Sequence, residues 1–271
     1  MARTAAVVAA RGVHSERTSE VSMSIRVLVN GAKGKMGQEV VRAVRAESDL
    51  DLVGETDLGD RLNEAIARTR AGVVVDFTHP SAAVRNTEEI IHCGAHPVIG
   101  TTGFEAADIR RLEELASSRK LGGLIAPNFA IGAVLLMRFA AEAARYLPDV
   151  EIIELHHDQK ADAPSGTAIK TAELIAERRG SPPPRRVAEK EEKELISGVR
   201  GGRCRDIAIH SVRLPGLVAH QEVLLGGLGQ LLTLRHDSLA RTSFMPGVIL
   251  AVRKVPQLDR LYYGLERILE L

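Results

Sequence analysis

Short runs of branched apolar residues alternate with stretches of helical periodicity over the first half of the chain. The apolar runs lie at 25–30, 50–53, 73–77, 97–100 and 124–126. Valines at helical spacing, Val40, Val41 and Val44, follow the first run. Short apolar runs that end at glycine or polar residues are typical of buried strands, and their alternation with helices indicates a parallel sheet. The predicted fold class is therefore α/β, with a Rossmann-like, doubly wound sheet.

The pattern changes after a helical segment at 131–146. A strand is predicted at 151–155 and a helix up to residue 176, followed by strand-like runs at 207–214, 219–225 and 231–236. Pro-Gly and Gly-Gly turns separate these runs, which predicts a second, α+β domain with a mixed or antiparallel sheet. A last helical pattern at 246–255 could return to the first domain, although periodicity alone does not fix that return.

Composition narrows the class of protein. The chain has 271 residues, is 45% hydrophobic and carries a net charge of +1, which indicates a globular protein with a sizeable core. The near-neutral balance argues against nucleic-acid or membrane-surface binding, and no apolar run approaches the ~20 residues of a membrane span. Cys93 and Cys204 form no paired motif, so we expect no metal site, no disulfide and a reducing, cytoplasmic location. We interpret residues 1–24 as a disordered leader or an over-extended start.

A glycine turn after the first predicted strand indicates a dinucleotide site. Gly31, Gly34 and Gly37 are spaced GxxGxxG between a strand and a helix, with Lys33 and Lys35 among them. Glycines let the backbone approach a pyrophosphate, and the helix N-terminus favours its charge. Asp57, at the end of the second predicted strand, is placed to accept hydrogen bonds from an adenosine ribose. The alternative is a glycine-bearing turn without ligand, as occurs in many α/β proteins.

The loops after the later strands should lie at the same edge of the sheet. Because ligands bind at the carboxyl ends of parallel strands, we expect residues 76–78, 100–102 and 127–129 to line the cofactor crevice.

Proton donors are concentrated in residues 154–168. His156 and His157 are followed by Lys160 and by a Ser165-Gly166-Thr167 turn that opens a helical pattern. Imidazole exchanges protons near neutral pH, and first-turn amides without partners would bind a carboxylate. A negatively charged substrate is therefore expected. The alternative is structural, because histidines at a strand end and a Ser cap are also common without any ligand.

Five ordered motifs resemble those of one enzyme family. They are Asn30-Gly-Ala-Lys-Gly-Lys-Met-Gly37, Asp76-Phe-Thr-His-Pro80, Gly100-Thr-Thr-Gly103, Ala126-Pro-Asn-Phe-Ala-Ile-Gly132, and Glu154-Leu-His-His157 with Lys160-Ala-Asp-Ala-Pro-Ser-Gly-Thr167. Together they resemble dihydrodipicolinate reductase, also called 4-hydroxy-tetrahydrodipicolinate reductase, which serves the diaminopimelate route to lysine. The resemblance extends from residue 25 to the C-terminus.

The resemblance implies a division into domains and a set of roles. Residues 25–129 and 240–271 would form the dinucleotide-binding domain, and residues 130–239 a substrate-binding and oligomerisation domain of a homotetramer. His156 would be the general acid and Lys160 an assisting donor. Substrate carboxylates would be held by His157, Ser165, Gly166 and Thr167. Cofactor contacts would come from Gly31, Ala32, Lys33, Gly34, Lys35, Met36, Asp57, Gly100, Thr101, Thr102, Ala126, Pro127, Asn128 and Phe129.

The expected activity is reduction of a small dicarboxylate heterocycle by hydride from a nicotinamide and a proton from His156. An acid at Asp57, followed by a leucine where an arginine could have met the phosphate of NADPH, favours NADH. Because Lys33 and Lys35 could still meet that phosphate, we expect both NADH and NADPH to serve. Two alternatives stay open. One is another NAD(P)-dependent oxidoreductase of amino-acid metabolism, and the other is a non-catalytic dinucleotide sensor.

Overall fold

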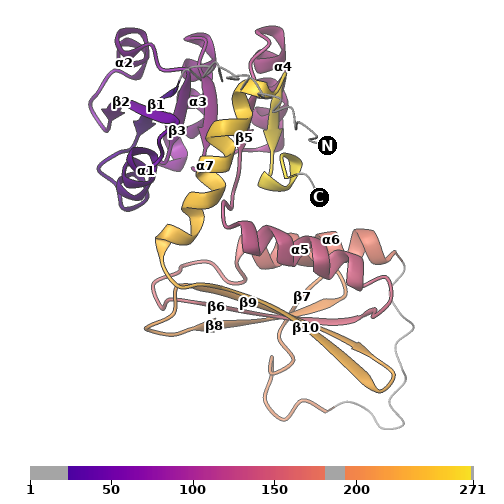
Figure 1. The fold of residues 1–271 in the computed structure, drawn as a ribbon. Helices are drawn as coiled ribbons and strands as arrows, with labels where there is room; N and C mark the ends of the chain where they lie inside the picture. Colours follow the sequence, from indigo (N-terminus) through magenta and orange to yellow (C-terminus); the bar gives the residue numbers. More distant parts are fainter. Residues whose placement is uncertain (1–23, 181–192, 270–271) are drawn as a thin grey trace, which may run out of the picture.

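The computed structural model describes residues 24–180 and 193–269, and these build two sheets with helices packed on them (Figure 1). Apart from Ser24, the predicted leader at 1–24 lies outside the described residues. Among the described residues, no helix has the length and apolar character that crossing a membrane requires.

The first sheet is parallel throughout. Its strand order is β11-β5-β4-β3-β1-β2. The strands are β1 (Ile25–Asn30), β2 (Leu50–Thr56), β3 (Val73–Asp76), β4 (His96–Ile99), β5 (Gly123–Ile125) and β11 (Leu261–Tyr263). The predicted Rossmann-like sheet is thereby confirmed.

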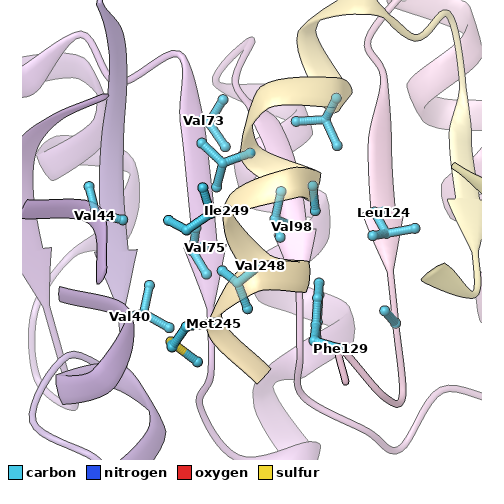
Figure 2. Close-up of a cluster of buried hydrophobic side chains, with 14 of the residues drawn as sticks. Val40, Val44, Val73, Val75, Val98, Leu124, Phe129, Met245, Val248 and Ile249 are labelled. Atoms are coloured by element: carbon cyan, nitrogen blue, oxygen red, sulfur yellow. The ribbon is translucent and has the colours of Figure 1, made fainter. Parts of the chain in front are cut away.

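Helices cover both faces of this sheet because the strands are apolar on both sides. One face packs against α1 (Lys35–Ala46) and α7 (Met245–Lys254), and the other against α2 (Leu62–Thr69), α3 (Pro80–His92) and α4 (Ala106–Ser118). Figure 2 shows Met245, Val248 and Ile249 of α7 in the same apolar layer as Val73 and Val75 of β3. The C-terminal helix thus completes a core that the N-terminal strands begin.

The second sheet is mixed, as expected. Its order is β10-β9-β6-β8-β7, in which β6 and β8 are parallel and the other neighbours antiparallel. Its strands are β6 (Asp149–His156), β7 (Gly202–Cys204), β8 (Ile207–Arg213), β9 (Ala219–Gly227) and β10 (Gln230–Ser238). Two helices, α5 (Ile131–Ala143) and α6 (Gly166–Arg179), pack on one face around a third apolar core (Figure 1).

The chain passes between the sheets twice. The first passage runs from β5 into α5, and the second from β10 through a 3₁₀ turn at Arg241–Phe244 into α7. Two further 3₁₀ turns, Val255–Gln257 and Leu265–Arg267, flank β11. Residues near both connections therefore lie where the two sheets meet.

Candidate active site

The loop between β1 and α1 lies against the backbone that follows β3. Gly31 has a φ of 81°, and a Cβ on it would overlap the carbonyl of Phe77. A Cβ on Gly37 would overlap the Gly31 carbonyl in turn. Gly34 precedes the helix and offers no side chain to the first-turn amides. Glycine is thus required for this close approach, and it leaves a helix N-terminus open to an anion.

Asp57 lies beside this loop at the end of β2. Its Oδ2 accepts a hydrogen bond of 2.8 Å from the Lys33 amide, and its Oδ1 one of 2.8 Å from the Leu58 amide. The amides of Leu58 and Lys33 hold the pKa of the carboxyl below its usual value. Asp57 is therefore an ionised acceptor next to the glycine loop.

A cavity of about 540 Å³ brings Gly31, Gly34 and Asp57 together. Arg61 and Arg85 also line it, and the sequence had not singled out either. The helix N-terminus is open, the glycine positions have no room for a side chain, and the acid is ionised. These features fit the pyrophosphate and ribose of a dinucleotide. Of the other predicted residues of this loop, Lys33 and Lys35 are exposed, Met36 is half-buried and Ala32 is buried.

A buried carboxylate connects the loops that follow β1, β3 and β4. Asp76 is fully buried and accepts hydrogen bonds from Asn30 (2.7 Å), Asn86 (2.9 Å), Thr101 (2.8 Å) and the Thr78 hydroxyl (2.8 Å). The hydroxyl of Thr101 is therefore directed into the protein. Gly100, Thr101 and Thr102 do not line the cavity that holds Asp57.

The predicted residues 126–129 form the connection from β5 to α5. Ala126 and Phe129 are buried in the first core, whereas Pro127 and Asn128 line a second cavity of about 370 Å³. Asn128 donates a hydrogen bond of 3.3 Å to the hydroxyl of Thr167 in α6. This segment thus joins the end of the first sheet to the start of α6.

His156 ends β6, and its ring is held by a carboxylate. Its Nδ1 lies 2.5 Å from Oε2 of Glu154, whose side chain is 0% exposed. Arg213 donates to both carboxylate oxygens of Glu154, at 2.9 and 2.8 Å. Burial raises the pKa of Glu154, but hydrogen bonds from His156, Arg213 and Ser211 lower it to about 2. With Nδ1 engaged, Nε2 is the ring nitrogen left to exchange a proton.

The helix N-terminus beside His156 differs in one respect from the prediction. The Ser165 amide was expected to be unpaired, but it donates to Glu154 Oε1 at 3.3 Å. The prediction treated Ser165 as part of the first turn, whereas it is the residue that caps α6, with its hydroxyl accepting from the Ala168 amide. Within the described part of the chain, the Gly166 and Thr167 amides have no acceptor.

A small cleft brings part of the predicted substrate site together. His156, Ser165, Thr167 and Asn128 line it. His157 is exposed and Lys160 forms an ion pair of 2.6 Å with Asp162, and neither of them lines this cleft. The structure therefore brings the first histidine to the start of α6, whereas the second histidine and the lysine are not among the residues that line the cleft.

The cleft also contains residues that the sequence reasoning missed. His220 and His236 line it from β9 and β10, and His220 Nδ1 lies 2.7 Å from Asp237. Burial lowers the pKa of His236. Glu154 and Arg213 were missed as well. The alternation of side chains along a strand could have indicated that Glu154 is buried, because it lies on the same face of β6 as Val150 and Ile152.

Comparisons with known proteins point to one enzyme family. Residues 25–129 match the family described as "Dihydrodipicolinate reductase, N-terminus", and residues 132–269 match "Dihydrodipicolinate reductase, C-terminus". A 4-hydroxy-tetrahydrodipicolinate reductase of Desulfitobacterium hafniense is 51% identical over 267 residues, 91% of this chain and 99% of the relative. One from Streptococcus pneumoniae is 53% identical over 258 residues, 91% of this chain and 100% of the relative.

A solved structure matches most of this chain. The dipicolinate-bound dihydrodipicolinate reductase from Paenisporosarcina sp. TG-14 superposes with a TM-score of 0.83 at 46% identity, covering 91% of this chain and 100% of that one. GenD2 from gentamicin A biosynthesis, at 16% identity and a TM-score of 0.60, shares the fold alone. Matches to both parts of the family, over almost all the described residues, show that the chain belongs to the dihydrodipicolinate reductase family.

Proposed function

We propose that the protein reduces 4-hydroxy-tetrahydrodipicolinate to tetrahydrodipicolinate with NADH or NADPH, in lysine biosynthesis via diaminopimelate. Its relatives in two bacteria carry the name of this enzyme, and a related structure is described as bound to dipicolinate, a planar heterocyclic dicarboxylate. The observation that carries the proposal is the cleft where His156 lies beside the N-terminus of α6. A proton donor next to an anion site is what reduction of a charged heterocycle requires.

Loss of water breaks the bond between the ring and its hydroxyl and a C–H bond on the neighbouring ring carbon, whose hydrogen leaves with the hydroxyl. The conjugated ring that remains then takes up one hydride and one proton. When bound, the reduced nicotinamide supplies the hydride. His156 donates the proton from Nε2 to the ring atom where electron density accumulates, since Nδ1 is engaged by Glu154. A positioned acid of this kind typically contributes roughly 10²- to 10⁴-fold to the rate.

The substrate carboxylates bind at the N-terminus of α6. The Gly166 and Thr167 amides lie in the first turn without protein acceptors among the described residues, and the Thr167 hydroxyl lies beside Asn128. Lys160 contributes a cation at the border of the site, after its ion pair with Asp162 opens. His157 is exposed and contributes from the same border. These contacts orient the ring toward His156.

The cavity at Asp57 holds the nucleotide part of the cofactor. The glycine loop and the open start of α1 receive the pyrophosphate, while Asp57 accepts hydrogen bonds from the ribose diol. Arg61 and Arg85 line the same cavity and can meet a 2′-phosphate. We therefore expect both cofactors to serve, with NADH favoured because of Asp57. A much higher kcat/KM with NADPH than with NADH would contradict this expectation.

The proposal includes a homotetramer and a cytoplasmic location. The face of the second sheet opposite α5 and α6 carries no helix within the described residues (Figure 1). Leu231 on β10 is 66% exposed there, and Ile153 and Leu155 of β6 are only half-buried. Such a face is suited to packing against another copy. Light scattering should give four times the subunit mass of 29.3 kDa, and a monomer would contradict the assembly.

The activity is tested by following NADH consumption with enzymatically generated substrate. The wild type should consume NADH and form tetrahydrodipicolinate, whereas His156→Gln should lose roughly 10²- to 10⁴-fold in kcat with a smaller change in KM. A matched control is His92→Gln, because His92 is exposed in the last turn of α3 and lines neither the substrate cleft nor the cavity at Asp57. Unchanged turnover in His156→Gln would remove the assignment of the acid. NADH binding without turnover in the wild type would instead indicate a dinucleotide sensor.

A further inference from the structure

Glu154 occupies a position that the reaction outlined above does not yet explain. Its carboxylate is fully buried, although charged groups are costly to bury unless they are paired. Both oxygens are engaged: Oε2 by His156 and Arg213, and Oε1 by Arg213 and the Ser165 amide. One carboxylate thus contacts both the proton donor and the residue that caps the substrate-binding helix.

The contact with His156 fixes how the ring holds its protons. A carboxylate accepts hydrogen bonds, so the Nδ1 that lies 2.5 Å from it carries the hydrogen. Nε2, the other ring nitrogen, is then the atom that gains and loses the proton used in the reaction. After donation, the ring is left as the neutral form protonated on Nδ1, which is the form that Glu154 stabilises.

The charge of Glu154 also acts on the reacting state of the ring. Hydrogen bonds from His156, Arg213 and Ser211 outweigh the effect of burial and lower the pKa of this carboxyl to about 2. The Glu154 carboxyl is therefore ionised over the whole pH range in which activity would be measured. A negative charge in contact with an imidazole stabilises the imidazolium, which is the form that can donate.

Arg213 keeps the carboxylate in place. Its guanidinium binds both oxygens of Glu154 and also donates to the Asp162 carbonyl at 2.7 Å. Asp162 lies in the turn between His157 and α6, so Arg213 ties this turn to β6. The spacing between His156 and the start of α6 is set by this pair of side chains.

We propose that Glu154, held by Arg213, is a positioning residue of the reductase. It fixes His156 with the proton on Nδ1 and Nε2 available to the substrate, and it stabilises the protonated ring. This inference rests on the proposed role of His156 as the proton donor. A role limited to holding the turn between β6 and α6 is the alternative that the experiment must separate.

The first test is the pH dependence of kcat in Glu154→Gln, which keeps the shape of the side chain and removes its charge. A general acid must be protonated, so activity is present at low pH and is lost as the pH rises. Without the carboxylate the protonated ring is less stable. The alkaline fall in kcat should therefore move to lower pH by about one unit or more, with kcat at neutral pH reduced roughly tenfold or more and KM changed less.

Glu151→Gln is the matched control. Glu151 lies on the same strand but the opposite face, where it also accepts from a histidine, His210 at 2.8 Å, and from an arginine, Arg200. Its substitution should leave the pH at which kcat falls unchanged. If Glu154→Gln lowers kcat but leaves the pH of the alkaline fall unchanged, Glu154 only holds the turn and the proposal is wrong.

Two further measurements keep the proposal testable if Glu154→Gln folds poorly because Arg213 loses its partner. The double variant Glu154→Gln/Arg213→Gln removes the pair together and should show the same shift in the pH of the alkaline fall. In the wild type, ¹⁵N NMR at alkaline pH should find neutral His156 protonated on Nδ1. Protonation on Nε2 would overturn the proposal. The NMR result does not depend on turnover, so it separates failure of this inference from failure of the proposed function.

Discussion

At Gly31, in the glycine loop between β1 and α1, both the backbone conformation and the lack of space require a glycine. A side chain there must adopt a φ of 81° and also displace the backbone at Phe77. We predict that Gly31→Ala lowers the free energy of unfolding by roughly 2–4 kcal/mol, as strain and a backbone clash combine, and raises KM for NADH. Urea unfolding and steady-state kinetics measure the two effects.

Gly94 provides the control for that prediction. Its φ of 78° is similar, but a Cβ on it would meet nothing within 4 Å. Gly94→Ala should therefore cost only about 1 kcal/mol, which is the backbone strain alone. Equal effects of the two substitutions would show that the contact with Phe77 is unimportant.

The buried carboxylate of Glu154 makes a prediction about stability and pH. Its pKa is about 2 in the folded protein against an ordinary value of 4.5, so its contribution is full above pH 4.5 and is lost as the pH falls toward 2. This depression corresponds to about 3 kcal/mol. The difference in unfolding free energy between wild type and Glu154→Gln should shrink as the pH is lowered from about 5 to about 3. A constant difference over that range would contradict the depressed pKa.

Single residues were predictable from the sequence where a local motif carried them. The glycine loop, Asp57 and His156 stand at strand ends or in short motifs, so pattern and spacing indicated them. Arg213 and His220 could not be found in this way, because they reach the site by strand pairing, β8 and β9 each lying next to β6. Thr101 was expected in the crevice, but its hydroxyl is bonded to Asp76.

At the scale of elements, the start of α6 carries the substrate contacts that we propose. The Ser165 hydroxyl accepts from the Ala168 amide at 3.2 Å and closes the first turn. We predict that Ser165→Ala lowers stability by about 1 kcal/mol and raises KM for the substrate more than it lowers kcat. Ser118→Ala, at the end of α4, is the control and should leave KM unchanged. An unchanged KM in Ser165→Ala would separate the helix start from substrate binding.

Most elements followed from helical periodicity or from short runs of branched apolar residues. The helix predicted at 246–255 is α7 at Met245–Lys254, and the strand predicted at 207–214 is β8 at Ile207–Arg213. The elements missed were α2, β7 and β11, of which the two strands have three residues each. Three residues show no period. The equally short β5 was predicted from its apolar run at 124–126, whereas β7 and β11 contain no run of branched apolar residues.

At the scale of the whole molecule, the C-terminal segment completes the first sheet with an edge strand, β11, and a covering helix, α7. Beyond the packing of α7, Arg253 binds Asp49 at 2.7 Å and Glu47 at 2.6 Å, more than 200 positions earlier in the chain. Hydrogen bonding to Arg253 is the main cause that lowers the pKa of Asp49. Arg253→Met should lower the free energy of unfolding by about 1 kcal/mol, since the group is partly exposed. No loss in urea unfolding would show that apolar packing alone holds α7.

The arrangement of the two sheets could be expected from the family resemblance but not from periodicity. Periodicity left the return of the C-terminal segment open, because a helical pattern does not state which core it joins. The structure resolves this with Met245 and Val248 in the first core and β11 beside β5. The division into one domain of residues 25–129 and 240–271 and a second domain of residues 130–239 stays a prediction, as does the homotetramer.

The central claim is that this chain transfers a hydride to a dicarboxylate ring while His156 supplies the proton. The most direct test uses NADH carrying deuterium at the transferred position, with enzymatically generated 4-hydroxy-tetrahydrodipicolinate and mass spectrometry of the product. We predict that tetrahydrodipicolinate gains the deuterium with the wild type and that His156→Gln forms it at least about a hundredfold more slowly. A folded wild-type protein that binds NADH and yields no deuterated product would contradict the account.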